Sequence, residues 1–210
     1  MYRKYGKRLM DIIISGISLV LLSPVILVTA VMVRIKLGDP VIFKQKRPGL
    51  NEKIFELYKF RTMTNAVDKN GNLLPDSERL TGFGRFLRSS SLDELPELVN
   101  ILKGDMSIVG PRPLLVRYLD RYDDTQRHRH DVRPGLTGLA QINGRNLVNW
   151  AERFEYDLKY IEDISFVRDL KILVKTVSCV LSKKGISSGT SETMEEFMGN
   201  NQRIDKKTEN

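Results

Sequence analysis

Ser91-Leu92-Asp93-Glu94-Leu95-Pro96-Glu97-Leu98-Val99-Asn100 is the stretch around which the rest of this 210-residue sequence is organised. Its apolar residues recur at helical spacing, which predicts a short amphipathic helix. Pro96 lacks an N–H and fits only a first helical turn, so we expect the helix to begin near Asp93 or Glu94. Ser91 and Glu94 also stand at capping-box spacing. Two adjacent carboxylates are thereby predicted at a helix N-terminus, where free N–H groups and the helix dipole keep acids ionised and can also receive a phosphate.

Taken by itself, the pair Asp93 and Glu94 has a simpler interpretation, because acidic residues commonly cap helices without any further role. The rest of the sequence decides between the two. A chain of 210 residues forms one domain with a real core, or a small domain plus membrane-associated pieces. The net charge of +8 indicates an anionic partner, which is nucleic acid, phospholipid headgroups or phosphorylated substrates. Cys179 is the single cysteine, so an internal disulfide is excluded and a reducing compartment is expected.

An uncharged apolar segment runs from Ile12 to Val33, and its 22 residues exceed the roughly 20 that span a bilayer as a straight helix. Ser23 and Pro24 fall in the middle, where proline breaks or kinks a helix. Basic residues flank both ends, and positive charge marks the cytosolic side of a membrane segment. A re-entrant helix-break-helix and a kinked spanning helix both remain open on these residues.

Three charged residues stand at the start of that segment. Asp11 is at helical spacing from Lys7 and Arg8, and pairing would lower the cost of an acid near lipid. The two cations could equally bind a phospholipid headgroup.

The soluble part begins with two short strands around residues 41–45 and 54–60, joined by turn residues, which predicts a β-hairpin. Lys59 and Arg61 lie on one face of its second strand by alternation. The stretch 68–72 looks like a calcium loop, but Gly71 stands at its fourth position instead of the sixth, so we interpret it as a polar turn.

Arginines at constrained positions are the next candidate anion contacts. Arg88 precedes the acidic pair, and Arg112 lies between Pro111 and Pro113, which restrict the backbone and favour aiming the guanidinium at a phosphate. A rigid loop with a solvated arginine is the alternative. Arg145 closes a glycine-rich loop over residues 133–145 whose backbone could approach an anionic ligand closely.

Histidines and the C-terminal helices carry weaker signals. His128 and His130 alternate as metal ligands can, yet flanking arginines disfavour a cation, so structural roles are expected. Residues 150–160 predict an aromatic amphipathic helix, and the next helix has an apolar stripe made of Phe166, Leu170, Leu173, Val174, Val177 and Leu181. Such helices pack on a core by default, but basic faces and aromatics also suit an in-plane membrane helix. From Lys183 on, the chain is polar and expected to be loosely ordered.

The motifs taken together resemble one family, the small monotopic phosphoglycosyl transferases, which are bacterial sugar transferases acting on undecaprenyl phosphate. The resemblance covers roughly residues 1 to 198 in collinear order. It is carried by Lys7-Arg8 with Asp11, Ser23-Pro24, Gln45-Lys46-Arg47-Pro48-Gly49, Lys59-Phe60-Arg61-Thr62-Met63, Leu92-Asp93-Glu94-Leu95-Pro96, Gly110-Pro111-Arg112-Pro113 and Arg133-Pro134-Gly135-Leu136-Thr137-Gly138.

The resemblance implies transfer of a phospho-sugar from a UDP-sugar to undecaprenyl phosphate with release of UMP. It implies Asp93 as the nucleophile that forms an aspartyl-phosphosugar intermediate, and Mg²⁺ bound at Asp93. Glu94 corresponds to the second acid, which we assign as a base toward the lipid phosphate. The expected substrate contacts are Lys59, Arg61, Arg88, Pro111, Arg112 and Arg145; Lys7 and Arg8 are the expected headgroup contacts, and Ser23 and Pro24 the re-entrant break.

The fold implied is α+β and mostly helical. It consists of a re-entrant membrane hairpin over 1–36, a cytosolic catalytic domain with a small β-hairpin and interfacial helices over 37–184, and a polar tail over 185–210. The location implied is the cytosolic face of the bacterial cytoplasmic membrane, with membrane lipids and no nucleic acid as partners. The donor expected is an N-acetylated amino sugar, with di-N-acetylbacillosamine first by overall similarity and N-acetylgalactosamine next. A non-catalytic membrane-anchored anion-binding or scaffold protein is the alternative.

Overall fold

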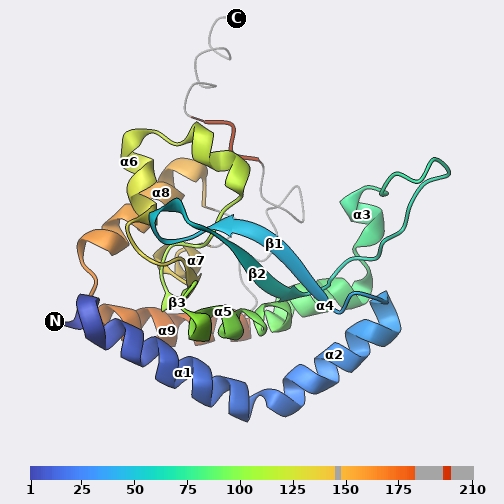
Figure 1. Cartoon of the computed structure of the whole chain (residues 1–210), viewed down its shortest axis with the longest axis horizontal. Coiled ribbons are helices and arrows are strands. Elements are labelled where there is room, and N and C mark those ends of the chain that lie inside the picture. Colours follow the sequence, from blue (N-terminus) through green and yellow to red (C-terminus); the bar gives the residue numbers. More distant parts are fainter. Residues whose placement is uncertain (145–147, 183–195, 200–210) are drawn as a thin grey trace, which may run out of the picture.

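Two N-terminal helices form a bent arm along the lower side of the molecule in Figure 1. The computed structural model describes residues 1–144, 148–182 and 196–199. After a π-helical turn, η1 (Tyr2–Gly6), come α1 (Lys7–Leu21) and α2 (Ser23–Leu37), with a bend of 64° between them. Pro24 stands in the first turn of α2, where a missing N–H is tolerated. The predicted helix break at Ser23 and Pro24 is therefore confirmed.

Membrane crossing is a separate question from the bend. Within the described ranges, none of the helices is by itself both long and apolar enough to cross a bilayer. The bent pair of Tyr2–Leu21 and Ser23–Leu37 qualifies when its two helices are taken together, on length and composition alone. The re-entrant path of this arm stays a prediction.

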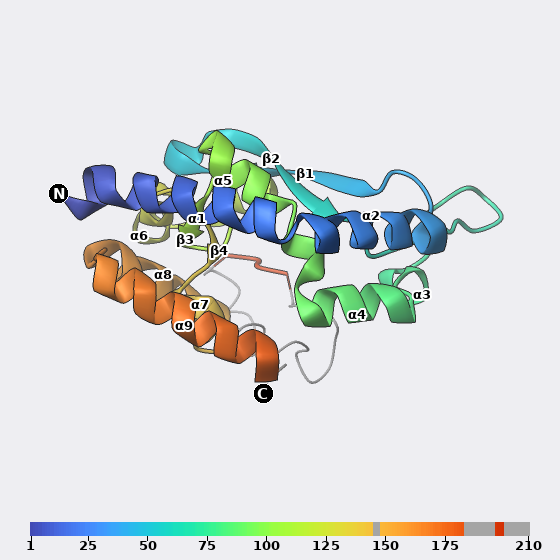
Figure 2. The same cartoon turned by 90° about the horizontal axis from the view of Figure 1, so that it is seen from below.

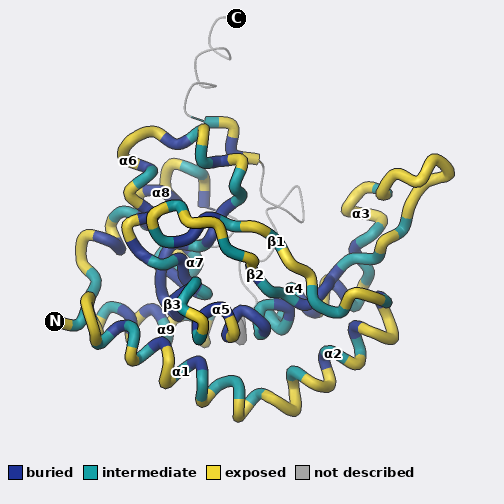
Figure 3. The backbone as a smooth tube through the Cα atoms, in the orientation of Figure 1, coloured by how far each residue is buried: buried dark blue, intermediate teal, exposed yellow. Residues whose placement is uncertain are grey.

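Helix α1 is amphipathic in the sense opposite to that of a water-soluble helix. Lys7, Asp11 and Ser15, spaced four residues apart, are buried against the protein. Apolar residues point outward instead, and Val20 and Leu21 are 73% and 71% exposed. The exposed turns run along both helices in Figure 3. Because a soluble helix buries its apolar stripe, this arrangement indicates an apolar environment outside the arm.

Lys7 and Arg8 contact protein groups. Lys7 Nζ lies 2.7 Å from the buried carboxylate of Asp169. Arg8 donates to the carbonyls of Ile101 and Leu102, at 2.6 and 2.8 Å. These bonds fasten the arm to two other helices, and the headgroup contact expected of both cations finds no support in them.

Asp11 also has protein partners, and they differ from the pairing that its spacing suggested. Its Oδ1 accepts from the Ser107 hydroxyl at 2.9 Å and from the Ile108 N–H at 2.8 Å. Asp11 thereby ties α1 to a central strand, whereas Lys7 pairs elsewhere. Because Asp11 is buried and accepts both hydrogen bonds, it fixes the position of α1 relative to the domain.

The predicted β-hairpin is confirmed. Strands β1 (Ile42–Pro48) and β2 (Ile54–Phe60) pair antiparallel across a turn that contains the 3₁₀ segment η2 (Leu50–Glu52). The turn at 68–72 is polar, as expected, because Asp68 accepts from backbone N–H groups of the same loop. The short helix α3 (Asp76–Arg79) follows it.

The acidic stretch departs from its prediction. Helix α4 (Gly82–Ser90) is followed by the 3₁₀ turn η3 (Leu92–Glu94). Helix α5 (Glu97–Lys103) begins at Glu97, three or four residues later than expected, with Pro96 as its N-cap. Ser91 has a φ of 57° because it ends α4 in the left-handed conformation, and it makes no side-chain capping bond. The predicted capping box is wrong, and the acids lie on a turn between two helices.

Two short strands form the centre of the domain. Strands β3 (Ser107–Val109) and β4 (Gly135–Thr137) pair in parallel. A Cβ on Gly135 would meet the Gly110 nitrogen at 2.1 Å, so this glycine serves a close approach of two chain segments. Close packing of two chain segments therefore accounts for a glycine that was expected to let a ligand approach the backbone.

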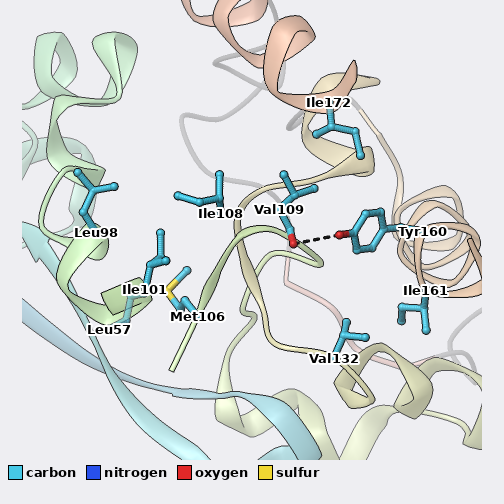
Figure 4. Packing of buried hydrophobic residues seen from close by; sticks show 10 residues of the cluster. All are labelled: Leu57, Leu98, Ile101, Met106, Ile108, Val109, Val132, Tyr160, Ile161 and Ile172. Atoms are coloured by element: carbon cyan, nitrogen blue, oxygen red, sulfur yellow. Dashed lines mark hydrogen bonds between the residues drawn. The ribbon is translucent and has the colours of Figure 1, made fainter. Parts of the chain in front are cut away.

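The main core surrounds these strands. Figure 4 shows its residues from β2, α5, β3 and the C-terminal helices pointing toward one another, with the Tyr160 hydroxyl donating to the Val109 carbonyl at 3.1 Å. The outer elements are η4 (Val116–Arg121), α6 (Asp124–Arg127), η5 (His128–His130), α7 (Leu139–Ile142), α8 (Trp150–Glu162) and α9 (Phe166–Ser182).

Helix α9 turns the side that carries Asp169 and Ile172 inward. Asp169 is 0% exposed, whereas Phe166, Leu170, Val174 and Val177 of the apolar stripe are 48–64% exposed. Leu173 of the stripe packs against the main core, so the expected packing of the stripe on the core holds for Leu173 and not for these four residues. Figure 2 shows α9, α4 and the arm α1–α2 together on one side of the molecule.

Candidate active site

An acidic cluster with two cations forms where three segments meet. Asp93 and Glu94 lie on η3, Glu97 opens α5, Lys59 ends β2 and Arg112 follows β3. Arg112 Nη2 lies 2.6 Å from Glu94 Oε1. Lys59 Nζ lies 2.9 Å from the same oxygen and 3.0 Å from Glu97 Oε1. Both cations therefore converge on Glu94, while no ion pair is found for Asp93 in the described part of the chain.

Lys59 reaches this cluster because α5 is fixed against the hairpin. The buried Asn100 accepts from the Tyr58 N–H at 3.0 Å and donates to the Glu56 carbonyl at 2.7 Å. One side-chain amide thus sets the register of α5 against β2. Since Lys59 follows Tyr58, its ammonium is carried to the first turn of α5.

Arg112 is held through its backbone. Pro111 and Pro113 restrict its dihedral angles, as predicted, and its carbonyl accepts from Arg129 Nη2 at 2.8 Å. Arg129 is itself in a buried ion pair with Asp157 at 2.8 Å. The guanidinium of Arg112 is consequently aimed at Glu94, and this pair replaces the solvated arginine of the alternative interpretation.

Burial and charge divide the ionisation of the acids. Burial, with the adjacent Glu94 carboxylate, raises the pKa of Asp93 to about 6. Burial raises the pKa of Glu97 to about 7 against the effect of Lys59. Burial acts the same way on Glu94, but the charges of Arg112 and Lys59 outweigh it and hold that pKa well below its usual range. Nearby cations, and not a helix N-terminus, are what keep an acid ionised here.

The other predicted contacts lie at different distances from the cluster. Arg88 donates from Nε to the Thr62 hydroxyl at 3.1 Å, and its charge lowers the pKa of Asp93. Arg61 points away and donates to the Leu37 carbonyl at 3.2 Å. Pro111 is buried, and Arg145 lies outside the described residues. The structure thus brings Lys59 and Arg112 to the acids, sets Arg88 beside them and leaves Arg61 out.

A cavity of about 200 Å³ opens from this cluster. Lys59, Glu97 and Arg112 of the cluster line this cavity. Its lining also includes the cations Arg47 and Arg153 and the aromatic residues Tyr118 and Trp150. Guanidinium groups with aromatic rings are a combination that recognises phosphate together with a flat or apolar group.

Sequence reasoning missed most of this lining. Glu97 carried no signal beyond its place in the acidic stretch, and Arg47 read as part of a turn. The stretch that contains Trp150 and Arg153 was predicted only as an aromatic amphipathic helix over residues 150–160. Because they come from separate elements, only the fold brings them together.

An apolar groove of about 430 Å³ lies between α2 and α4. Its lining includes Pro24, Val28 and Met32 of α2, Phe83 and Phe86 of α4, and Leu92 of the acidic turn. Leu92 directly precedes Asp93. The groove therefore connects the bend of the arm with the acidic turn.

Metal binding depends on which donor side chains lie close together. Among the described residues, no group of three or more His, Cys, Asp or Glu side chains is placed to hold an ion. His128 pairs with Asp131 on the surface, and His130 is buried near the Gly49 carbonyl, which agrees with structural roles. Mg²⁺ commonly takes one or two carboxylates and completes its shell with water and substrate phosphates, so Asp93 fits a shared site of that kind.

An α+β domain with paired acids, fixed cations and an outward apolar arm is the arrangement of a membrane-associated phosphoryl-transfer enzyme. The family model described as "Bacterial sugar transferase" matches residues 2–183. The chain belongs to the bacterial sugar transferase family, which confirms the predicted class of enzyme, a phosphoglycosyl transferase.

Individual relatives agree with this assignment. The chain is 54% identical over 193 residues to the uncharacterized sugar transferase EpsL of Bacillus subtilis, covering 92% of this chain and 96% of that one. It is 46% identical over 181 residues to the UDP-glucose:undecaprenyl-phosphate glucose-1-phosphate transferase of Klebsiella pneumoniae, covering 81% of this chain but 39% of that one. It is 37% identical over 199 residues to the undecaprenyl-phosphate galactose phosphotransferase of Salmonella typhimurium, covering 87% and 42%. The sugars in these names are glucose and galactose.

Proposed function

We propose that this protein transfers a phospho-sugar from a UDP-sugar to undecaprenyl phosphate, releasing UMP through an aspartyl-phosphosugar intermediate. The observation that carries the proposal is the difference in ion pairing between two adjacent acids. Glu94 pairs with both Arg112 and Lys59, while the Asp93 carboxylate forms no ion pair with any of the described residues. The printed names of two relatives, which specify a sugar phosphate and undecaprenyl phosphate, support the substrate classes.

The proposed chemistry has two displacements. An Asp93 carboxylate oxygen forms a bond to the sugar-linked phosphorus, and the bond from that phosphorus to the bridging oxygen breaks, so UMP leaves with the electron pair. A phosphate oxygen of the lipid then attacks the same phosphorus and releases the carboxylate. A pKa of about 6 leaves Asp93 mostly ionised at neutral pH, as a nucleophile requires.

The donor is assigned to the cationic cavity. Its guanidinium groups, among them Arg47 and Arg112, suit a diphosphate, and Tyr118 and Trp150 suit the flat uracil or the apolar face of a sugar. Arg112 borders both the cavity and Glu94. A diphosphate in this place lies beside the acidic turn.

The acceptor is assigned to the apolar groove between α2 and α4. A polyprenyl chain needs an apolar channel, and the lining of this groove includes Leu92, next to the proposed nucleophile. The outward apolar residues of the arm and of α9 support a membrane surface on the same side. We therefore place the protein on the cytosolic face of the bacterial cytoplasmic membrane, with α1–α2 as a re-entrant hairpin.

Mg²⁺ is proposed to bind between Asp93 and the donor diphosphate. When bound, the ion would neutralise charge on the phosphates. Lys59 and Arg112 orient the acidic turn, and Arg88 adds positive charge close to Asp93. Glu94, with its depressed pKa, is a weak base, so we favour for it a positioning role over the base role suggested by the resemblance.

The donor sugar follows from the resemblance alone. It favours an N-acetylated amino sugar, di-N-acetylbacillosamine before N-acetylgalactosamine. Glucose and galactose, which the relatives' names specify, are the competing donors. Release of UMP across a panel of these UDP-sugars would rank them.

The test uses purified full-length protein in nanodiscs with Mg²⁺, undecaprenyl phosphate and the UDP-sugar panel. Wild type is expected to release UMP, and mass spectrometry is expected to detect a phosphosugar adduct on Asp93 when the acceptor is left out. Asp93→Asn should abolish both signals, whereas Asp76→Asn, an exposed acid outside the cluster, should change neither. Turnover that survives Asp93→Asn would sink the nucleophile assignment. A wild type that releases no UMP would favour the non-catalytic anion-binding or scaffold protein.

A further inference from the structure

Residues Glu196–Gly199 return to the body of the domain (red in Figure 1) and lie beside the segment that contains η4 and α6. Phe197 is 3% exposed, which is the burial of a core residue. It belongs to a cluster that is separate from the main core and that also contains Leu114, Tyr118, Tyr122 and Phe154.

The ring of Phe197 is surrounded by other aromatic rings. Its centroid lies 5.1 Å from Phe154, 5.3 Å from Trp150, 5.8 Å from Tyr118 and 5.9 Å from Tyr122. The interplanar angles range from 29° to 75°, so edge-to-face and stacked contacts both occur. Aromatic contacts of this kind add to the burial of the ring and are directional.

Charged groups fix the neighbouring backbone. Glu196 pairs with Arg117 and Arg121, both at 2.8 Å. Arg121 also donates to the carbonyl of Phe197. Exposed ion pairs contribute little stability, so they set the path of the segment while the aromatic ring supplies most of the binding.

The same cluster borders the cationic cavity. Tyr118 and Trp150 line that cavity, and both contact Phe197. Tyr118 and Trp150 also meet each other edge to face, with centroids 5.6 Å apart. Phe197 therefore stands behind two side chains that form a wall of the cavity, although it does not line the cavity itself.

We propose that Phe197 is a positioning residue of the donor site, which holds Tyr118 and Trp150 in the orientation that receives the nucleotide-sugar. The inference rests on the proposed function, since it takes the cationic cavity as the donor site. Its consequence is specific. Loss of Phe197 weakens donor binding but leaves the acidic cluster, the arm and the lipid groove as they are.

Trp150 supplies a direct probe, because it is the single tryptophan of the chain. Its fluorescence reports on the cavity wall without any turnover. Binding of UDP is expected to change this emission in the wild type. Displacement of Phe197 is expected to shift the emission of the free protein.

The experiment compares Phe197→Ala, Phe197→Leu and Phe197→Tyr with wild type in nanodiscs. Leucine keeps the fold where alanine leaves too large a cavity, and tyrosine restores the ring. We expect the first two to raise the KM for the UDP-sugar and the Kd for UDP about tenfold, with kcat within about threefold, since a weakened donor site affects binding before chemistry. Phe197→Tyr should restore both constants, and the KM for undecaprenyl phosphate should stay unchanged in every variant.

Met198→Ala is the matched control, because the next side chain is 49% exposed and outside the aromatic cluster. Folded Phe197→Leu protein with shifted Trp150 emission but wild-type KM and Kd would overturn the inference. So would a fall in kcat at constant donor KM. A wild type that turns over while UDP leaves Trp150 emission unchanged would remove the donor from this cavity, and a wild type that releases no UMP would refute the proposed function itself.

Discussion

Arg112 Nη2 lies 2.6 Å from Glu94 Oε1, and this ion pair joins the loop after β3 to the turn that carries Asp93. The oxygen is shared with Lys59, so the two cations act on the acidic turn together. An arginine offers a planar fork that a lysine lacks. The ion pair between Arg112 and Glu94 therefore fixes the orientation of the acidic turn and, with it, of the Asp93 carboxylate.

Arg112→Lys is expected to lower kcat about a hundredfold, because misplacement of a reacting group by about 1 Å has an effect of that size. Thermal unfolding should change little, because lysine keeps a positive charge beside Glu94. The measurement is UMP release at saturating UDP-sugar. Arg168→Lys, which alters an ion pair on the far surface, is the control, and equal losses in both variants would contradict the role of Arg112.

The pH dependence of the first displacement follows from the pKa of Asp93, which burial and Glu94 raise to about 6. A nucleophilic carboxylate must be ionised, so the rate should be constant above this pKa and fall tenfold per pH unit below it. Single-turnover UMP release without acceptor isolates this step, since the phosphate of the lipid then takes no part. A rate that stays constant from about pH 5 to about pH 8 would refute the requirement for an ionised Asp93.

Glu97 predicts an effect on stability. Its pKa rises from 4.5 to about 7 on burial, so the folded state binds a proton that the unfolded state releases between those values. The contribution of Glu97 therefore becomes less favourable as pH rises through that window, by roughly 3 kcal/mol in total.

Glu97→Gln, a neutral isostere, should remove this term. We expect the variant to unfold at a higher temperature than wild type at pH 8 and at nearly the same temperature at pH 4. Scanning calorimetry in detergent at both pH values would measure it. A variant that loses stability at pH 8 would show that the Lys59 ion pair outweighs the burial of charge.

The sequence allowed the local elements to be predicted, but only part of the site. The hairpin, the break at Pro24 and the polar turn at Asp68 depend on residues close in sequence, and all three are confirmed. The predicted start of α5 was wrong because Ser91 ends α4 and therefore does not cap the next helix. Periodicity cannot distinguish such a residue from an N-cap.

The meeting of residues from distant segments was beyond reach for a different reason. Lys59 reaches Glu97 only because Asn100 fixes α5 on β2, and Trp150 reaches the cavity through α8. The stripe on α9 was correctly identified, yet periodicity cannot tell whether such a stripe faces a core or a membrane. The buried Asp169 settles which side is inward.

Two glycines of α4 test how the helix is seated. A Cβ on Gly84 would come within 1.8 Å of the Thr62 carbonyl oxygen, whereas the nearest atom to a Cβ on Gly82 is a side-chain nitrogen at 4.0 Å. Gly84→Ala should destabilise the protein by about 2 kcal/mol or more, because overpacking forces backbone shifts. Gly82→Ala should be neutral or stabilising by up to about 1 kcal/mol. Denaturant unfolding of both variants checks this, and equal stabilities would contradict the close packing of α4 on residue 62.

The exposed apolar stripe of α9 predicts a membrane contact that does not depend on the arm. Val174 and Val177 are 64% and 61% exposed. Helix α9 lies on the side of the molecule that also presents α1–α2 (Figure 2). Val174→Asp combined with Val177→Asp should reduce the fraction of protein that floats with liposomes after detergent removal and raise the KM for undecaprenyl phosphate. The donor KM should stay the same, because the cationic cavity lies elsewhere.

Its control must separate apolar contact from charge, since two aspartates also weaken attraction to anionic lipid. Lys171→Gln combined with Lys175→Gln lowers the net charge by the same amount on the same helix and keeps the stripe intact. We expect this control to change flotation only on anionic liposomes, whereas the aspartate pair should lose binding on neutral ones as well. Equal behaviour of the two double variants on neutral liposomes would mean that α9 does not bury its stripe in the lipid surface.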